Sequence, residues 1–348
     1  MIKIYFPKNL YDSRFRSDLF PLLKPFLKKG AFTDTERIAM YDVSEKDFIL
    51  VDTIQEADWA ILPMAWNYYK KYKRISKVLD FIKLAKKESK KVLSFTNGDF
   101  GIDIPEIENV VVYRQSGDRS LLPKYHIGMP SFIVDPLKKI YQTNDLTFNS
   151  YTKIPIIGFC GQANNSILNS VKEISGTLLH NVKSSIYIND HCTRKIQSTS
   201  YLRSKVLQKI KISSLLEEQF IERKSYRAGA TTKKERQKTT LEFYTNIKNT
   251  DYTVCVRGAG NFSVRFYETL AMGRIPIFIN TDCILPLADK IDWKKHVVWV
   301  EENELDRIEK HILNFHNSLS PDKIKKIQQS NRKLWKEQLT LGGFFKNI

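Results

Sequence analysis

Residues 252–280 read YTVCVRGAGNFSVRFYETLAMGRIPIFIN. This pattern predicts a strand at 252–256, a glycine loop at 258–260, a helix at 263–272 and a buried strand at 275–279. Ligands of open α/β sheets bind outside the carboxyl ends of parallel strands, which is where this loop lies. The stretch therefore predicts a ligand site inside a strand–loop–helix–strand unit.

The residue types around the glycine loop favour an anionic ligand. The first N–H groups of a helix and its dipole attract negative charge, and Gly258 lets a phosphate approach the main chain. Arg257 ends the strand and Arg265 lies in the first helical turn, so both guanidinium groups are placed to bind a diphosphate. Ser263 opens the helix, and Glu268 follows it at a position that suits a carboxylate binding two ribose hydroxyls. The alternative is a surface ion pair between Arg265 and Glu268, worth under about 1 kcal/mol.

Two named phosphate motifs are excluded. Ser263 stands where a G-x-G-x-x-G motif would have its third glycine, and no G-x-x-x-x-G-K-[ST] motif occurs in the chain. Neither a nicotinamide-dependent dehydrogenase nor a P-loop kinase is supported.

The rest of the chain repeats the alternation of strands and helices. Its 348 residues are enough for two domains at about 150 residues each. In the first half we expect strands at 2–6, 57–63, 92–96 and 110–113, and one helix within 66–90. In the second half we expect strands at 154–160, 185–188 and 297–300, helices at 167–179, 202–221, 305–315 and 322–339, and an exposed basic loop at 223–238. This rhythm predicts parallel sheets covered by helices.

The polar stretch 135–153 separates the two halves. We therefore predict an N-terminal domain at 1–150, a C-terminal domain at 151–320 and a final helical segment at 321–348 that packs back on the N-terminal domain.

Charge and cysteine content restrict the partners and the compartment. Lys and Arg number 56 against 38 Asp and Glu, which leaves +18 and favours nucleic acid, an acidic membrane surface or phosphate-bearing small molecules. The four cysteines lie far apart and form no C-x-x-C pair, so a zinc site and a disulfide framework are not predicted. We expect a cytoplasmic protein, with contact to an anionic membrane through its basic surface.

Several motifs resemble, in order, the C-terminal signature of the exostosin family of glycosyltransferases. They are Cys255-Val-Arg-Gly258, Ser263-Val-Arg-Phe-Tyr-Glu268, Ala271-Met-Gly273, Ile275-Pro-Ile277, Leu285-Pro286 and Ile291-Asp-Trp293. In the first half, Glu56-Ala-Asp-Trp-Ala-Ile-Leu-Pro63 resembles the family's acidic-alanine-aspartate strand. The segment 223–238 departs from the family pattern.

The resemblance implies an α/β protein of the GT-B type, with two Rossmann-like domains that face each other across a cleft. The C-terminal domain would hold a nucleotide-sugar, with UDP preferred and GDP second, and the N-terminal domain a glycan acceptor. The implied reaction is an inverting hexosyl or pentosyl transfer in polysaccharide or glycoconjugate synthesis, with no metal or other cofactor. The chain contains no Asp-x-Asp that would hold a metal-bound diphosphate.

An inverting transfer needs a general base on the acceptor side. The first candidate is Asp99 in a predicted turn at the end of a strand, with stabilisation of that turn as the alternative. His126 is the second candidate, although a lone histidine is usually a packed or solvated residue. Arg114 follows a strand and is the acceptor-side candidate, with an ordinary surface arginine as the alternative.

Further donor-side candidates follow from position in the chain. Gly161 and Gln162 come after the first strand of the second half, at the strand end that faces a GT-B cleft. Arg223 and Arg227 are placed to clamp the diphosphate from the basic loop, although a basic run is more often solvated.

Two other classes of function compete with an enzyme. A basic nucleic-acid-binding protein would fit the charge of +18, but no zinc finger, RNA-recognition or helix-turn-helix pattern is present and no nucleic acid is expected. A non-catalytic nucleotide- or sugar-binding relative would keep Arg265 and Glu268 without a working base.

Overall fold

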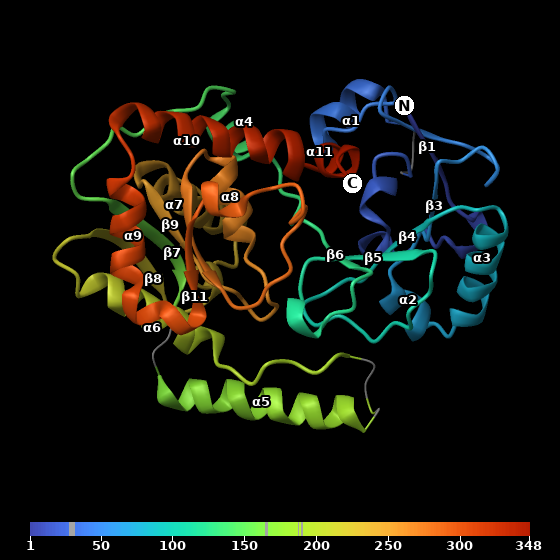
Figure 1. Cartoon of the computed structure of the whole chain (residues 1–348), viewed down its shortest axis with the longest axis horizontal. Helices are drawn as coiled ribbons and strands as arrows, with labels where there is room; N and C mark the ends of the chain where they lie inside the picture. The colour runs from blue at the N-terminus through green and yellow to red at the C-terminus, as the bar shows by residue number, and fades with distance from the viewer. Residues whose placement is uncertain (28–31, 164–165, 187, 189–190) are drawn as a thin grey trace.

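Two parallel sheets organise the structure, a computed structural model that describes residues 1–27, 32–163, 166–186, 188 and 191–348 (Figure 1). The first sheet has the strand order β2-β1-β3-β4-β5-β6, and its pairs are parallel. Its strands are β1 (Ile2–Tyr5), β2 (Phe48–Leu50), β3 (Trp59–Ile61), β4 (Val92–Phe95), β5 (Val110–Arg114) and β6 (His126–Gly128). The inner strands β4 and β5 are buried along their whole length, as the apolar runs require.

The second sheet is parallel as well and has the order β11-β10-β9-β7-β8. Its strands are β7 (Ile156–Gln162), β8 (Glu217–Arg223), β9 (Tyr252–Cys255), β10 (Ile275–Asn280) and β11 (Val298–Glu301). The chain goes from β7 outward to β8 and then crosses back to β9 on the other side of β7. The strand order therefore reverses between β7 and β9, and the carboxyl ends of these strands form the crevice at which such sheets bind ligands.

Amphipathic helices cover both sheets. In α8 (Val264–Ala271), Phe266 and Leu270 are buried, and in α3 (Ile75–Lys87) Val78 and Ile82 are buried. The other helices are α1 (Asp34–Tyr41), α2 (Trp66–Lys71), α4 (Pro136–Tyr141), α5 (Ile167–Ser185), α6 (Thr199–Lys211), α7 (Lys233–Asn249), α9 (Ile308–Asn317), α10 (Pro321–Leu334) and α11 (Leu341–Lys346).

The two sheets belong to two Rossmann-like domains that lie side by side (Figure 1), which is the GT-B arrangement and confirms the predicted fold class. All strands of the first sheet come before residue 150, and all strands of the second sheet come after it. At the end of the chain, α10 packs on α8 of the second domain, whereas α11 reaches the first. Phe345 of α11 lies against Phe20 and Tyr113, with ring centroids 5.5 and 5.9 Å apart.

Three predicted elements are wrong. Residue 185 ends α5 and residue 188 lies in a bend, so no strand forms over the described part of 185–188, while 187 lies outside the described residues. The helix predicted at 202–221 ends at Lys211, and 217–223 is the edge strand β8, whose polar sequence suits a strand with one side exposed. The segment predicted as a loop at 223–238 includes the first turn of α7, which Thr232 caps through a capping box with Glu235.

The helix expected within 66–90 is divided into α2 and α3, because Lys73 adopts a left-handed conformation between them (φ 51°). Within the described residues, no helix combines the length and the apolar composition that crossing a membrane requires.

Candidate functional site

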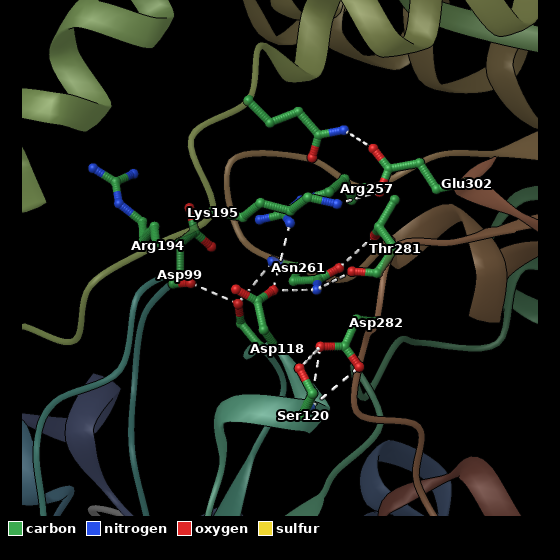
Figure 2. A network of polar contacts seen from close by, with 12 residues as sticks. Asp99, Asp118, Ser120, Arg194, Lys195, Arg257, Asn261, Thr281, Asp282 and Glu302 are labelled. Carbon is green, nitrogen blue, oxygen red and sulfur yellow. Dashed lines mark hydrogen bonds and ion pairs between the residues drawn. The ribbon is translucent and has the colours of Figure 1, made fainter.

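A cavity of about 230 Å³ lies between the two domains and is lined by both. The N-terminal domain contributes the loop at Asp99 and the residues that follow β5, and the C-terminal domain contributes Arg194, Arg257 and the glycine loop. The lining thus joins the carboxyl edge of the first sheet to the crevice of the second. Figure 2 shows the polar side chains that converge there.

Asn261 of the glycine loop connects the domains at this cavity (Figure 2). Its backbone N–H donates to Ser116 Oγ at 2.8 Å, and its Nδ2 donates to Asp118 Oδ1 at 2.6 Å. Its Oδ1 accepts a hydrogen bond from Thr281 Oγ1 at 2.7 Å. Ser116 Oγ in turn donates to the main-chain oxygen of Asp99 at 2.6 Å. The network fixes the glycine loop against the candidate base.

A second set of hydrogen bonds between the domains joins Arg119 and Ser120 to Asp282. The backbone N–H of Arg119 donates to the main-chain oxygen of Asp282 at 2.7 Å, and Ser120 Oγ donates to the Asp282 carboxylate at 2.5 Å. Both residues of the first domain come from the segment that follows β5, so this segment holds the two domains together next to Asp118.

Arg257 is the cation best placed to bind a ligand in the cavity. Its side chain is 7% exposed, and Nη1 lies 3.6 Å from Asp118 Oδ1, beyond hydrogen-bond distance. Among the described residues, its Nε and Nη1 have no hydrogen-bond partner. Burial lowers the pKa of Arg257, with Asp118 opposing the shift. Leaving buried N–H groups unpaired is costly, so an anion in the cavity would stabilise this arginine.

Arg265 differs from its predicted role. Its guanidinium donates to the main-chain oxygens of Cys160 at 2.9 Å and Val254 at 3.3 Å, and it lies 4.3 Å from the ring centre of Phe159. It therefore joins the ends of β7 and β9 and is not turned toward a bound diphosphate. Gly161 permits this contact, because a Cβ there would lie 2.5 Å from Arg265 Nη2.

Arg203 of α6 joins the same strand ends from the other side. Its Nη1 donates to the main-chain oxygen of Gln162 at 2.7 Å, and its Nη2 donates to that of Arg257 at 3.1 Å. Burial and the nearby Arg265 lower the pKa of Arg203 to about 10. The crevice between β7 and β9 is thus crowded with cations, which favours an anionic ligand.

Glu268 lies behind Arg265 and accepts a hydrogen bond from Tyr244 Oη at 2.9 Å. Burial raises the pKa of Glu268, while Tyr244, Arg265 and Arg227 act in the opposite direction. Because Arg265 donates to main-chain oxygens and Glu268 accepts from Tyr244, the surface ion pair considered above does not describe these side chains. Glu268 remains placed beside the crevice as a hydrogen-bond acceptor.

Of the remaining donor-side candidates, some lie at the glycine loop and others lie away from it. Gly258 begins the glycine loop, and its N–H donates to the main-chain oxygen of Phe262 at 3.1 Å. Ser263 follows the loop as the N-cap residue of α8. Arg223 does not lie in a basic loop, although this was predicted. It is the buried last residue of β8 and pairs with Glu242. Arg227 is exposed in a short turn with a left-handed backbone (φ 50°).

Asp99 is exposed and lines the cavity from the N-terminal domain. Opposite it, the Arg194 guanidinium lies 3.8 Å from the ring centre of Phe100, and Asp99 opposes the lowering of the Arg194 pKa that burial and Arg257 cause. Figure 2 shows Asp99 and Arg194 near the same side of the polar network. The predicted base therefore faces cations of the other domain.

His126 is not a suitable general base. It is 3% exposed, and its Nδ1 lies 3.1 Å from Arg114 Nη1. Because a guanidinium only donates, Nδ1 accepts and the proton of the neutral ring resides on Nε2. Burial, Arg114 and Arg119 lower the pKa of His126 to about 4. Neither nitrogen of the neutral ring is then available to accept a proton from an acceptor hydroxyl.

Arg114 was predicted to bind the acceptor, but the structure shows that it positions neighbouring loops instead. It is 2% exposed, and its Nε donates to the main-chain oxygen of Ser116. Gly101 leaves room for the guanidinium, since a Cβ there would lie 2.1 Å from Arg114 Nη2. The buried arginine thus organises the loops that carry Asp99 and Asp118.

The lowered pKa of His126 predicts a loss of stability in acid. Because the folded protein binds this proton only near pH 4, the contribution of neutral His126 is present above pH 6.5 and is lost as the pH falls toward 4, up to about 3 kcal/mol. We expect His126→Gln to flatten this part of the pH profile of the unfolding free energy, measured by urea denaturation. An unchanged slope in His126→Gln would contradict the assignment.

Asp118, Asn261, Arg194 and Arg203 are site residues that sequence reasoning missed. Asp118 could have been predicted from its position, because it follows β5 at the carboxyl edge of the sheet, as Asp99 follows β4. Asn261 lies in the glycine loop that was singled out, but its partners are about 20 and 143 residues away. Arg194 and Arg203 are placed by tertiary packing. Within the described residues, no three His, Cys, Asp or Glu side chains cluster closely enough to hold a metal ion.

Comparisons with known proteins identify related domains. The family model described as the Exostosin GT47 domain matches residues 180–315. Exostosin-1 of Drosophila melanogaster is 29% identical over 94 residues, or 27% of this chain and 12% of that protein. A protein named probable glucuronosyltransferase 47 A, from Physcomitrium patens, is 34% identical over 68 residues, or 20% of this chain and 15% of that protein. The solved structure of TarM aligns with a TM-score of 0.34 and 11% identity over 74% of this chain and 49% of that chain.

Proposed function

We propose that this chain, whose residues 180–315 match the Exostosin GT47 domain, is a glycosyltransferase that transfers a sugar from a nucleotide-diphosphate sugar to a hydroxyl group of a glycan acceptor. The chain matches only 12% and 15% of the two relatives named above, so the reaction is argued from its own site. The observation that carries the proposal is Arg257, a buried guanidinium with unpaired N–H groups in the cavity between the domains.

The donor is proposed to bind with its diphosphate near Arg257 and the N-terminus of α8. Negative charge develops on the leaving diphosphate during transfer, and fixed positive groups in a buried site stabilise it strongly. Arg257 and the helix dipole supply this charge from the protein, so we propose that the reaction requires no metal ion. UDP-sugars are the preferred donors and GDP-sugars the second choice, because of the family resemblance.

The acceptor is proposed to approach from the N-terminal domain, with Asp99 as general base. The acceptor oxygen forms a bond to the anomeric carbon on the face opposite the diphosphate, and the bond from that carbon to the phosphate oxygen breaks. Asp99 takes the hydroxyl proton and the nucleoside diphosphate leaves with the electron pair. This displacement inverts the anomeric configuration. Asp118 and Asn261 position the loops around the reacting atoms.

Glu268→Ala is expected to weaken UDP binding by about 1 to 3 kcal/mol if its carboxylate binds ribose hydroxyls, because those groups then lose their partner in a partly buried site. Calorimetric titration measures the effect. The control is Tyr244→Phe, which removes the hydroxyl that donates to Glu268 and leaves the carboxylate in place. An unchanged affinity in a folded Glu268→Ala variant would assign Glu268 a structural role only.

The reaction class is tested by incubating the protein with UDP- and GDP-sugars and a panel of oligosaccharide acceptors in EDTA, with the product read by NMR. The proposal expects a new glycosidic bond of inverted anomeric configuration and release of the nucleoside diphosphate. Retention of configuration, or activity restored only by an added divalent ion, would contradict the proposed mechanism. Nucleotide binding without turnover of any donor would favour the non-catalytic relative.

A further inference from the structure

Helix α5 lies apart from the two sheets, below both domains in the view of Figure 1. Its inward face is polar: Ser170, Thr177 and Ser184 are the buried residues of the helix. Glu173, the single acidic residue of α5, is also turned toward the body, where Ser198 Oγ donates to its carboxylate at 2.8 Å. The helix thus has the reverse of the usual pattern, with polar groups facing the protein.

The outward face of α5 is apolar. Leu168 is 83% exposed, Leu179 56% and Ile186, just after the helix, 59%. At about 100° per residue, the exposed apolar residues fall within about one third of the helix circumference. Besides Ile167 at the start of the helix, they are Leu168, Val171, Leu178, Leu179, Val182 and Ile186. We call these six residues the α5 stripe. A contiguous exposed stripe of this kind marks an interaction surface.

The charges beside the α5 stripe are positive. Lys172 and Lys183 are exposed and lie at one edge of the stripe, whereas the acidic Glu173 is turned away. The whole chain carries +18. An apolar stripe bordered by lysines is typical of a helix that lies in the interface of an anionic membrane.

We propose that α5 docks on the surface of an anionic phospholipid bilayer, with the α5 stripe in the interface and the lysines at the headgroups. A second copy of the chain is a poorer occupant, because antiparallel pairing of two α5 helices through the stripe brings their lysine-bearing edges together. Such contacts between like charges are unfavourable. The segment after α5 lines the cleft cavity through Cys192 and Arg194, so the docked membrane lies beside the cleft. Docking does not depend on the proposed transfer reaction.

The experiment is co-sedimentation of the full chain with vesicles of phosphatidylcholine containing phosphatidylglycerol, and with vesicles of phosphatidylcholine alone. We expect binding to the anionic vesicles and a loss of roughly tenfold or more in the double variant Leu168→Ser/Leu179→Ser. These side chains are exposed, so the variant keeps its fold. The matched control is Ile38→Ser/Met40→Ser on α1, which replaces two exposed apolar residues at the far side of the molecule and should bind like wild type.

The charge contribution is tested separately with Lys172→Gln/Lys183→Gln. This variant is expected to bind anionic vesicles more weakly than wild type, by up to roughly tenfold. The control Lys83→Gln/Lys87→Gln on α3 has the same net charge and should retain binding. Equal weakening in both pairs would show a general charge effect and overturn the assignment to α5. Absence of vesicle binding, or light scattering that shows a dimer abolished by Leu168→Ser/Leu179→Ser, would overturn it as well.

Discussion

Arg257→Ala is expected to lower kcat for sugar transfer by about 10²- to 10³-fold, as the loss of one fixed donor at a developing negative charge does in other enzymes. The unpaired N–H groups of Arg257 and its position at the end of β9 make it the side chain best placed to meet the leaving diphosphate. Steady-state kinetics with the preferred donor measures the effect. UDP affinity should fall too, because the diphosphate is present before transfer.

Two controls separate this effect from a loss of folding. Arg307→Ala removes one exposed positive charge that does not line the cavity and should leave kcat unchanged. Arg257→Lys keeps the charge but not the fork of donors, so its activity should lie between those of wild type and the alanine variant. Thermal unfolding reports whether the Asp118 carboxylate, left without its cation, destabilises the variants. A folded Arg257→Ala protein with wild-type turnover would exclude Arg257 from the diphosphate site.

Asp99→Asn should lower kcat by roughly two to four orders of magnitude and leave donor affinity unchanged, because the amide cannot accept the acceptor proton. The side chain of Asp99 keeps its size, and the hydrogen bond from Ser116 goes to its main-chain oxygen, so the loop is preserved. Asp103→Asn is the matched control, since Asp103 is another carboxylate of the same cavity. Full activity in Asp99→Asn combined with its loss in Asp103→Asn would transfer the role of base to Asp103.

The fold was predictable where local pattern and tertiary environment agree. In 252–280 the buried strands β9 and β10 and the helix α8 lie within two residues of their predicted bounds, because their apolar residues are spaced as strands and helices require. The GT-B class was implied by the family motifs, in agreement with the strand–helix rhythm of both halves. The position of the glycine loop at the carboxyl end of a parallel strand was also predicted.

Between residues 168 and 223 the tertiary environment overrides the local sequence pattern, and the strand predicted at 185–188 and the helix predicted at 202–221 were wrong. The α5 stripe is exposed, which local apolar periodicity cannot indicate, and β8 has a polar sequence because it is an edge strand. The side-chain roles of Arg265 and His126 also depend on distant partners. The sequence places Arg265 near the diphosphate, but the main-chain oxygen of Cys160, 105 residues away, accepts its hydrogen bond.

The central claim, that the crevice beside β9 binds a nucleoside diphosphate through protein cations, is tested most directly by calorimetric titration of UDP, GDP, ADP and CDP in EDTA. We predict selective binding of one of them, with UDP the first choice, and a marked loss of that binding in Arg257→Ala. Failure of all four to bind, or equal affinity in wild type and a folded Arg257→Ala variant, would contradict the account.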